Sequence, residues 1–262
     1  MKPRSTLPSW GLMLLLPPSP LLAQESISTD RPDFVESSLV VGASMVQIET
    51  SVAYERAGMG EQLWSTPTLL RIGISENLEV RAETEGLVSA QTEATPAFAS
   101  TDSADVSLGL KWHRQDGGTT GDWTPSTAWL LHLDLPTGGA PYRAGHAAPS
   151  LRWVAEWEPA EGWSLGVMPG LTWMDDGRGG RAMKGIFGVV VGRELGPGLR
   201  GFAELSMPEI ARQDNGGTIG NLDTGLAWNL GLDTQLDAAV SFGLTDDSPD
   251  FAATLGLSHR FR

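Results

Sequence analysis

The feature that most limits how this chain can fold is a repeated alternation of apolar and polar side chains. It is plainest in residues 78–85, where one face is apolar and the other carries Glu79, Arg81, Glu83 and Glu85. Successive side chains of a β-strand point to opposite faces, so a period of two predicts strands. A dry core does not accept such a row of charges, because unpaired buried charge is very costly. The charged face therefore needs water or dense ion pairing.

The alternation recurs along the chain and predicts its topology. We expect twelve strands, at residues 45–54, 66–74, 78–85, 104–113, 126–134, 149–158, 163–173, 183–193, 199–206, 220–230, 235–244 and 251–261. Short connections (75–77, 159–162, 194–198, 231–234) alternate with longer ones (55–65, 86–103, 135–148, 174–182, 207–219). This alternation of short and long connections predicts an all-β, antiparallel, up-and-down transmembrane β-barrel with short periplasmic turns and longer outer loops. Residues 114–122 are long for a periplasmic turn, and residues 245–250 are short for an outer loop.

Alternation alone does not decide which face lies inside the barrel. A soluble barrel would turn its large apolar side chains inward and pack them. A membrane barrel would instead enclose the charged and small residues, which predicts a narrow, wet, ion-paired lumen. The N-terminal leader, the rhythm of the connections and the positions of the aromatic residues favour the membrane barrel.

Large aromatic residues gather at two depths of the expected barrel. Those at the short-turn end are Trp112, Trp157, Trp163, Trp228 and Phe261, and those at the opposite end are Tyr54, Trp173 and Phe251. Trp129 and Trp153 fall in mid-strand and serve as apolar wall residues. Two such rings are typical of residues at the two membrane interfaces. The alternative is a set of core tryptophans in a soluble sandwich.

The first residues have the pattern of an export signal. Lys2 and Arg4 precede a short apolar run, and small residues follow up to a cleavage site near Ala23. The run is too short for a spanning helix, which needs about 20 residues. We therefore expect a signal peptide at residues 1–23, a polar ribbon at 24–44 and a β-barrel domain at 45–262, in the outer membrane of a Gram-negative cell.

The composition excludes several functions. Without Lys2 and Arg4 of the leader, the 18 basic residues fall to 16, against 32 acidic residues. Such an acidic chain is a poor nucleic-acid binder, because phosphate contacts need clustered basic residues. The chain has no cysteine, so thiol catalysis and cysteine-based zinc sites are excluded. Its four histidines lack ligand-like spacing, and we expect neither a metal site nor a cofactor.

By parity, charged residues line the lumen. The candidates are Glu49, Arg71, Glu79, Arg81, Glu83, Glu85, Arg152, Glu156, Arg200, Glu204, Asp223 and Asp237. Rings of such charge set ion selectivity in pores. The alternative is that they form interior ion pairs that hold a small barrel rigid and closed. A barrel of about twelve strands lies between filled barrels of about 8 strands and open porins of about 16, so both interpretations stay open.

The polar ribbon crowds charge and proline in front of the first strand, in the stretch TDRPDFVES at residues 29–37. We expect it to fold into the barrel mouth as a plug or gate, through Asp30, Arg31, Asp33 and Glu36. Its carboxylates would meet lumen arginines such as Arg71 or Arg81. The alternative is a disordered periplasmic tail, as chain termini often are.

Two stretches carry a family resemblance. TDRPDFVES and the hairpin PTLLRIGISENLEVR, at residues 67–81, resemble the meta-pathway phenol-degradation family of outer-membrane β-barrel proteins. The resemblance implies a transporter-like barrel linked to aromatic catabolism, without established catalytic residues. Its partners would be outer-membrane lipid, a small solute and the barrel-assembly machinery. One departure is that the chain ends Phe261-Arg262, whereas such barrels usually end on an aromatic residue that aids insertion.

We therefore expect an outer-membrane channel, not an enzyme, that passes small aromatic or hydrophobic solutes by diffusion through a charged lumen. One alternative is a hydrolase or acylase on the same barrel, using His132 and Asp134, which share a face two residues apart. Another is a plugged barrel with a structural or adhesive role.

Overall fold

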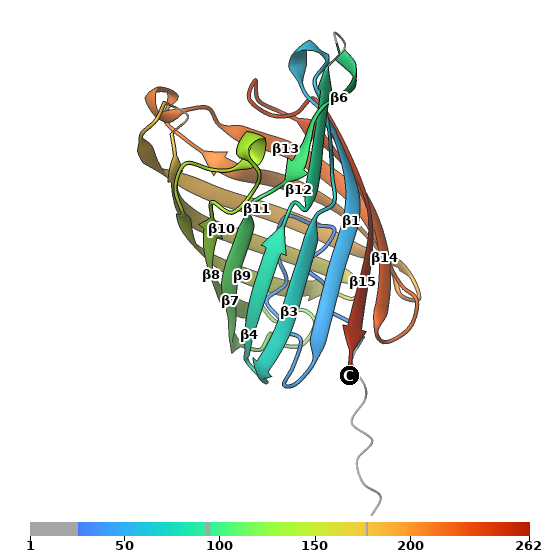
Figure 1. Cartoon of the computed structure of the whole chain (residues 1–262). Coiled ribbons are helices and arrows are strands. Elements are labelled where there is room, and N and C mark those ends of the chain that lie inside the picture. Colours follow the sequence, from blue (N-terminus) through green and yellow to red (C-terminus); the bar gives the residue numbers. More distant parts are fainter. Residues whose placement is uncertain (1–25, 93–94, 177) are drawn as a thin grey trace, which may run out of the picture.

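The computed structural model describes residues 26–92, 95–176 and 178–262, so the expected signal peptide lies outside the described residues. Twelve antiparallel strands form one closed barrel (Figure 1), in which β15 pairs with β1 to close the ring. Each of the twelve expected segments is a barrel strand. Their bounds are β1 (Val46–Arg56), β3 (Thr68–Ser75), β4 (Leu78–Thr84), β7 (Val106–Gln115), β8 (Ser126–Leu135), β9 (Ala148–Ala160), β10 (Trp163–Asp175), β11 (Arg181–Gly196), β12 (Leu199–Ile210), β13 (Ile219–Asn229), β14 (Thr234–Gly243) and β15 (Phe251–Phe261).

The ring closes without an open edge. β1 pairs with β15 over its whole length, from Val46 opposite Phe261 to Arg56 opposite Phe251. A membrane-spanning sheet needs this closure, because hydrocarbon offers no partner for backbone N–H and C=O groups. The pairing also puts the start of β1 and the end of β15 at the same end of the barrel, together with the short turns (Figure 1).

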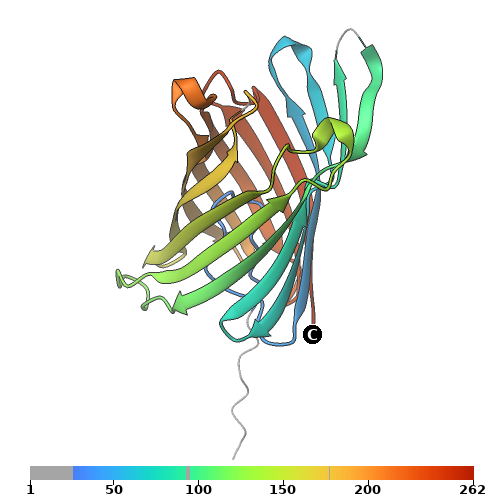
Figure 2. The same cartoon turned by 60° about the vertical axis from the view of Figure 1, so that its left-hand side comes forward.

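Two connections that we expected to be loops contain further strands. β1 pairs with β3 in its first half and with β2 (Gln62–Ser65) in its second half. β5 (Leu87–Thr92) and β6 (Thr95–Ser103) continue this sheet beyond the barrel ring, as a flap at the end opposite the short turns (Figure 2). These segments are short and their alternation is weak. The protruding half of β1 supplies the edge on which they form.

Three 3-10 turns lie in the long connections: η1 (Gly58–Gly60), η2 (Ala140–Tyr142) and η3 (Gln213–Asn215). Within the described ranges, no helix has the length and apolar character to cross a membrane.

The structure decides which face of the wall lies inside. In β1, Gln47 and Glu49 are buried, whereas Ile48 and Val52 are 37 % and 52 % exposed. The polar face therefore lines the lumen and the apolar face points outward, as in a membrane barrel. The inverted, soluble arrangement is excluded.

The aromatic residues at both ends lie on this outward face. Trp112, Trp163 and Trp228 are exposed at the short-turn end, and Trp173 at the other. Arginine guanidinium groups stack on three of these rings, at 4.2 Å for Trp112, 4.9 Å for Trp163 and 4.2 Å for Trp173. Tryptophan with a cation at its face suits the boundary between hydrocarbon and headgroups. The register also sets Trp129 beside both Trp112 and Trp153, so these two wall residues extend one aromatic row.

The chain terminus is accommodated at the same boundary. Phe261 is 50 % exposed on the outward face. Arg262 turns away from it and pairs with Asp233 of the β13–β14 turn, with Nε 2.8 Å from Oδ1. The final arginine thus leaves the aromatic residue in the ring at the short-turn end.

Candidate functional site

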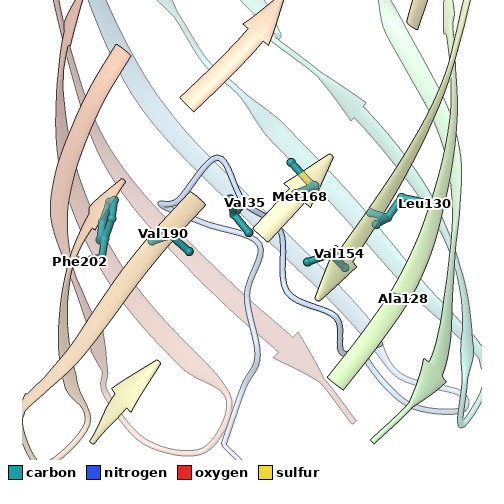
Figure 3. Packing of buried hydrophobic residues seen from close by; sticks show 7 residues of the cluster. All are labelled: Val35, Ala128, Leu130, Val154, Met168, Val190 and Phe202. Carbon is teal, nitrogen blue, oxygen red and sulfur yellow. The ribbon is translucent and has the colours of Figure 1, made fainter. Parts of the chain in front are cut away.

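The ribbon, residues 26–44, lies inside the barrel. It has no regular secondary structure. At one end the Ile27 amide donates to the Leu232 carbonyl of the β13–β14 turn (2.7 Å), and at the other the Ser44 amide donates to the Gly73 carbonyl of β3 (3.0 Å). Between these points the chain rises into the lumen, with Val35 near its apex (Figure 3). The first strand therefore begins only after the chain has crossed the lumen.

Asp30 of the ribbon meets three lumen cations. Its carboxylate lies 2.6 Å from Lys111 Nζ, 3.0 Å from Arg81 and 3.6 Å from Arg71. The three basic side chains are at most 1 % exposed. Buried cations of this kind need a carboxylate partner, because water does not reach them. Asp30 is thus a shared counter-ion for three strands of the wall.

Glu36, Asp33 and Arg31 make the ribbon's other ion pairs. Glu36 binds Arg81 and also Arg152, 2.7 Å away. Asp33 binds Arg200 at 2.6 Å. Arg31 reverses the polarity and binds Asp237 of β14 at 3.3 Å. The pairs reach around much of the ring: the partners stand on β4, β9, β12 and β14.

Wall glutamates accept hydrogen bonds from the backbone of the ribbon. Glu204 accepts from the amides of Phe34 (2.8 Å) and Val35 (2.7 Å). The other acceptors are Glu49 for the Asp30 amide, Glu156 for the Ser38 amide and Glu79 for the Val41 amide. A segment without secondary structure must satisfy its buried amides through side chains. Sequence reasoning missed this role, because alternation shows which residues face inward but not what they bind.

Arg71 joins the wall to the ribbon. Its guanidinium lies 3.0 Å from the Glu49 carboxylate and 2.9 Å from the Glu79 carboxylate. These glutamates stand on β1 and β4, the two strands that flank β3. The remaining N–H groups of Arg71 donate to the carbonyls of Ser28 and Leu39. The planar guanidinium fork suits this multiple recognition, which a lysine would not reproduce.

The other side of the ribbon packs against apolar side chains of the wall. Val35 contacts a buried cluster on β8 to β12 (Figure 3), whose wall members are Ala128, Leu130, Val154, Met168, Val190 and Phe202. Gly188 leaves room for the Val35 side chain, because a Cβ added at Gly188 would lie only 2.6 Å from Val35 Cγ2. The expectation of a lumen lined only by small and charged residues was therefore wrong. Beside the ribbon, the inner face of β8 to β12 forms an apolar core, because Val35 supplies an apolar partner for inward-facing apolar side chains.

The ion pairs shift the acidity of the ribbon carboxylates. Burial alone would raise the pKa of Asp30, but Arg71, Lys111 and Arg81 outweigh it and hold that pKa below 3.8. Glu36 is likewise buried, yet Arg81 and Arg152 hold its pKa well below 4.5. Asp33 behaves oppositely, since burial outweighs Arg200 and raises its pKa. Asp30 and Glu36 are therefore the carboxylates whose charge most strengthens the attachment.

A cavity of about 760 Å³ lies between the ribbon and the outer loops. Its inner boundary includes Arg31, Pro32 and Phe34, and its outer boundary includes His146 and Asp175. The remaining lumen candidates, Glu83, Glu85 and Asp223, line this cavity. Of these, Glu83 lies 3.9 Å from Arg81, and the side-chain carboxylate of Glu85 accepts only from Ser65 among the described residues. The candidates thus divide into a group that holds the ribbon and a group that faces the open lumen.

The geometry does not favour catalysis by His132 and Asp134. The His132 side chain is buried, and neither ring nitrogen has a hydrogen-bond partner in the described part of the chain. Its Nε2 lies 3.7 Å from Glu83. The hydroxyl of Ser150, directly across the ladder, is also unpartnered. A nucleophile and its base need contact at about 3.2 Å or less, and these groups are not so arranged.

No cluster of at least three histidine, aspartate or glutamate side chains with the arrangement of a metal site occurs among the described residues.

Solved structures of similar fold are outer-membrane barrels. The COG4313 outer membrane channel from Pseudomonas putida F1 is 16% identical, with 88% of this chain and 99% of that chain covered at a TM-score of 0.60. The NanC porin is 9% identical over 81% and 98% of the two chains, with a TM-score of 0.54. A KdgM porin solved in complex with disordered oligogalacturonate is 6% identical over 83% and 99%, with a TM-score of 0.53. These similarities show that the fold is that of outer-membrane β-barrel channels.

No curated protein sequence matches the chain. The model of the family described as "Putative MetA-pathway of phenol degradation" matches residues 29–261, which include the ribbon and the whole barrel. Because the match covers most of its length, the chain belongs to this family.

Proposed function

We propose that the protein is a passive channel of the outer membrane for small solutes, and that the ribbon is its constriction. The observation that carries the proposal is the 760 Å³ cavity, which runs from the outer loops down to the ribbon. A solute that enters from outside would pass through a polar lumen and meet the ribbon before the periplasm. The family supports an aromatic or hydrophobic solute, and the apolar surface of Pro32 and Phe34 is the part of the lumen that suits one.

The ribbon has contacts suited to reversible attachment. It forms no strand pairing with the wall in the described part of the chain. Its ion pairs and amide–carboxylate contacts can be replaced by water once the lumen is hydrated, because water-mediated hydrogen bonds are nearly as good as direct ones. Opening therefore requires no change in the barrel ladder.

A disulfide between the ribbon apex and the wall tests the constriction. The chain has no cysteine, and the short distance from Gly188 to Val35 suits a disulfide between Val35→Cys and Gly188→Cys. We expect the oxidised double variant to keep a low single-channel conductance, and reductant to restore larger openings. The lumen is otherwise unchanged by the redox treatment, so the difference reports on the ribbon.

A second disulfide serves as the matched control. The hydroxyls of Ser38 and Ser126 lie 2.6 Å apart, so cysteines there would tie down the ribbon near the wall but leave residues 26–37 free to move. This variant should open more readily than the apex disulfide when both are oxidised. Equal conductance in all redox states of both variants would falsify the constriction.

The pH dependence of opening follows from Asp30 and Glu36. Their pKa values are lower in the attached ribbon than in a solvated one, so attachment is stabilised above the usual values, 3.8 and 4.5, and lost as the pH falls through the lowered ones. Conductance should therefore not rise between neutral pH and about 4.5, and should rise only in stronger acid. Bilayer recordings at stepped pH, with the apex disulfide as control, measure this. A rise already at pH 6 would contradict it.

A further inference from the structure

Positive charge and negative charge are not evenly divided along the lumen. The cations of the lower lumen, Arg71, Arg81 and Lys111, are buried against the ribbon. The cavity above is lined by twelve acidic residues but by three arginines. These three are already paired: Arg31 with Asp237 (3.3 Å), Arg81 with Asp30 (3.0 Å) and Arg152 with Glu36 (2.7 Å). Ion pairs between the ribbon and the wall thus neutralise all three arginines that line the cavity.

Apart from Glu204, which accepts from two ribbon amides, five of the lining carboxylates have no basic partner within 4.0 Å among the described residues. They are Glu55, Glu85, Asp105, Asp134 and Asp223. They come from β1, β8, β13 and the connections beside β4 and β7, so they line the part of the ring that runs from β8 through β1 to β13. The register also places Asp223 directly beside Glu204, another lining acid. A cavity with low-dielectric walls and one sign of charge attracts ions of the opposite sign.

A separate observation concerns hydrogen bonds. Ser107 lines the cavity, is 7 % exposed, and its hydroxyl has no partner in the described part of the chain. The ladder places Ser107 directly between Glu83 of β4 and Asp134 of β8. Buried polar groups are ordinarily hydrogen-bonded, so an unpartnered one calls for a ligand or water. An ammonium group donates three hydrogen bonds and accepts none, which suits two carboxylates and a hydroxyl.

We infer that the cavity selects small organic cations: primary ammonium compounds whose charge is held near Glu83, Ser107 and Asp134 and whose apolar body rests on Phe34. The inference rests on the proposed channel function and names its solute class. Phe34 can contribute through its ring face as well as its apolar surface. Organic anions of the same size would be excluded by the unpaired carboxylates.

The test begins with the reversal potential of single channels in a KCl gradient. We expect a preference for K⁺ over Cl⁻ of about tenfold or more, within the range by which such fields concentrate ions. Permeation of three probes of matched size should then follow the order benzylamine, benzyl alcohol, benzoate. The combined substitutions Glu55→Gln, Asp134→Asn and Asp223→Asn should remove most of both preferences.

A matched variant has three acids replaced outside the lumen. Glu76 and Glu161 are exposed in short turns, and Glu194 is exposed near the end of β11. Their replacement by glutamine should leave both preferences unchanged. Channels that conduct but show no preference, or prefer Cl⁻ or benzoate, would overturn the inference while leaving the channel function intact. The absence of any single-channel steps would instead contradict the channel function. Calorimetric titration of the detergent-solubilised protein then decides the inference: benzylamine should bind more tightly than benzoate, and equal binding would overturn it.

Discussion

Removal of residues 24–37 is expected to raise the single-channel conductance severalfold. The deletion takes away the ribbon apex, so the lumen of the twelve-stranded ring is no longer crossed by chain. A ring of this size lies between barrels of about 8 strands that side chains fill and porins of about 16 strands that hold an aqueous channel. Planar-bilayer recordings of the purified variant beside the full-length mature chain measure the change.

The same deletion should also shift the balance of charge in the lumen toward the positive. It removes Asp30, Asp33 and Glu36 and leaves Arg71, Arg81 and Lys111 exposed to water. Its channels should therefore pass Cl⁻ more readily than those of the intact protein. Heat-modifiable gel mobility serves as the folding control. A folded variant with unchanged conductance would mean that the ribbon does not limit flow.

The substitution Arg71→Ala is expected to destabilise the protein by about 3–5 kcal/mol, which is the usual cost of removing one partner from a buried ion network. It would leave Glu49 without a cation, Glu79 with only Arg81 at 4.0 Å, and Asp30 with one cation fewer. Denaturant unfolding in lipid vesicles, followed by tryptophan fluorescence, measures the change in unfolding free energy.

Two variants separate the network from general effects of removing charge. Arg56→Ala removes an exposed arginine at the far end of β1, and its effect should stay within about 0.5 kcal/mol. Arg71→Lys keeps the charge but loses the planar fork, so it should fall between the two. A cost for Arg71→Ala as small as that of Arg56→Ala would mean that water, not the network, already solvates these carboxylates.

The fold of the barrel was largely predictable because the signal is local. Alternation within single segments located all twelve barrel strands, and the unequal connections placed the ends of β1 and β15 on one side. The flap of β2, β5 and β6 was not predictable in this way. Its strands depend on the free edge of β1, which exists only after β1 has paired with β15 and β3.

The candidate site was predictable only as a set of positions. Parity placed Glu49, Arg71 and Glu204 on the inner face, and the family motif drew attention to Asp30 and Glu36. Parity did not show that Glu204 binds backbone amides or that Asp30 joins three cations. Those contacts join residues 41 to 170 positions apart, and side-chain periodicity carries no information at that range.

What the sequence by itself determined is the wall: its strands, the charged and apolar faces, and the aromatic ends, because each follows from the period-two geometry of a strand. The alternation itself did not decide which face is inside, because it is the same for a barrel and its inverse. The leader, the connections and the aromatic positions favoured the polar face, and the burial of side chains in the closed ring established it. The tertiary structure also brings Val35 into contact with Met168 and Phe202, and it pairs the lumen cations with carboxylates of the ribbon. These depend on how the closed ring positions side chains around one unpaired segment, which is a property of the assembled fold.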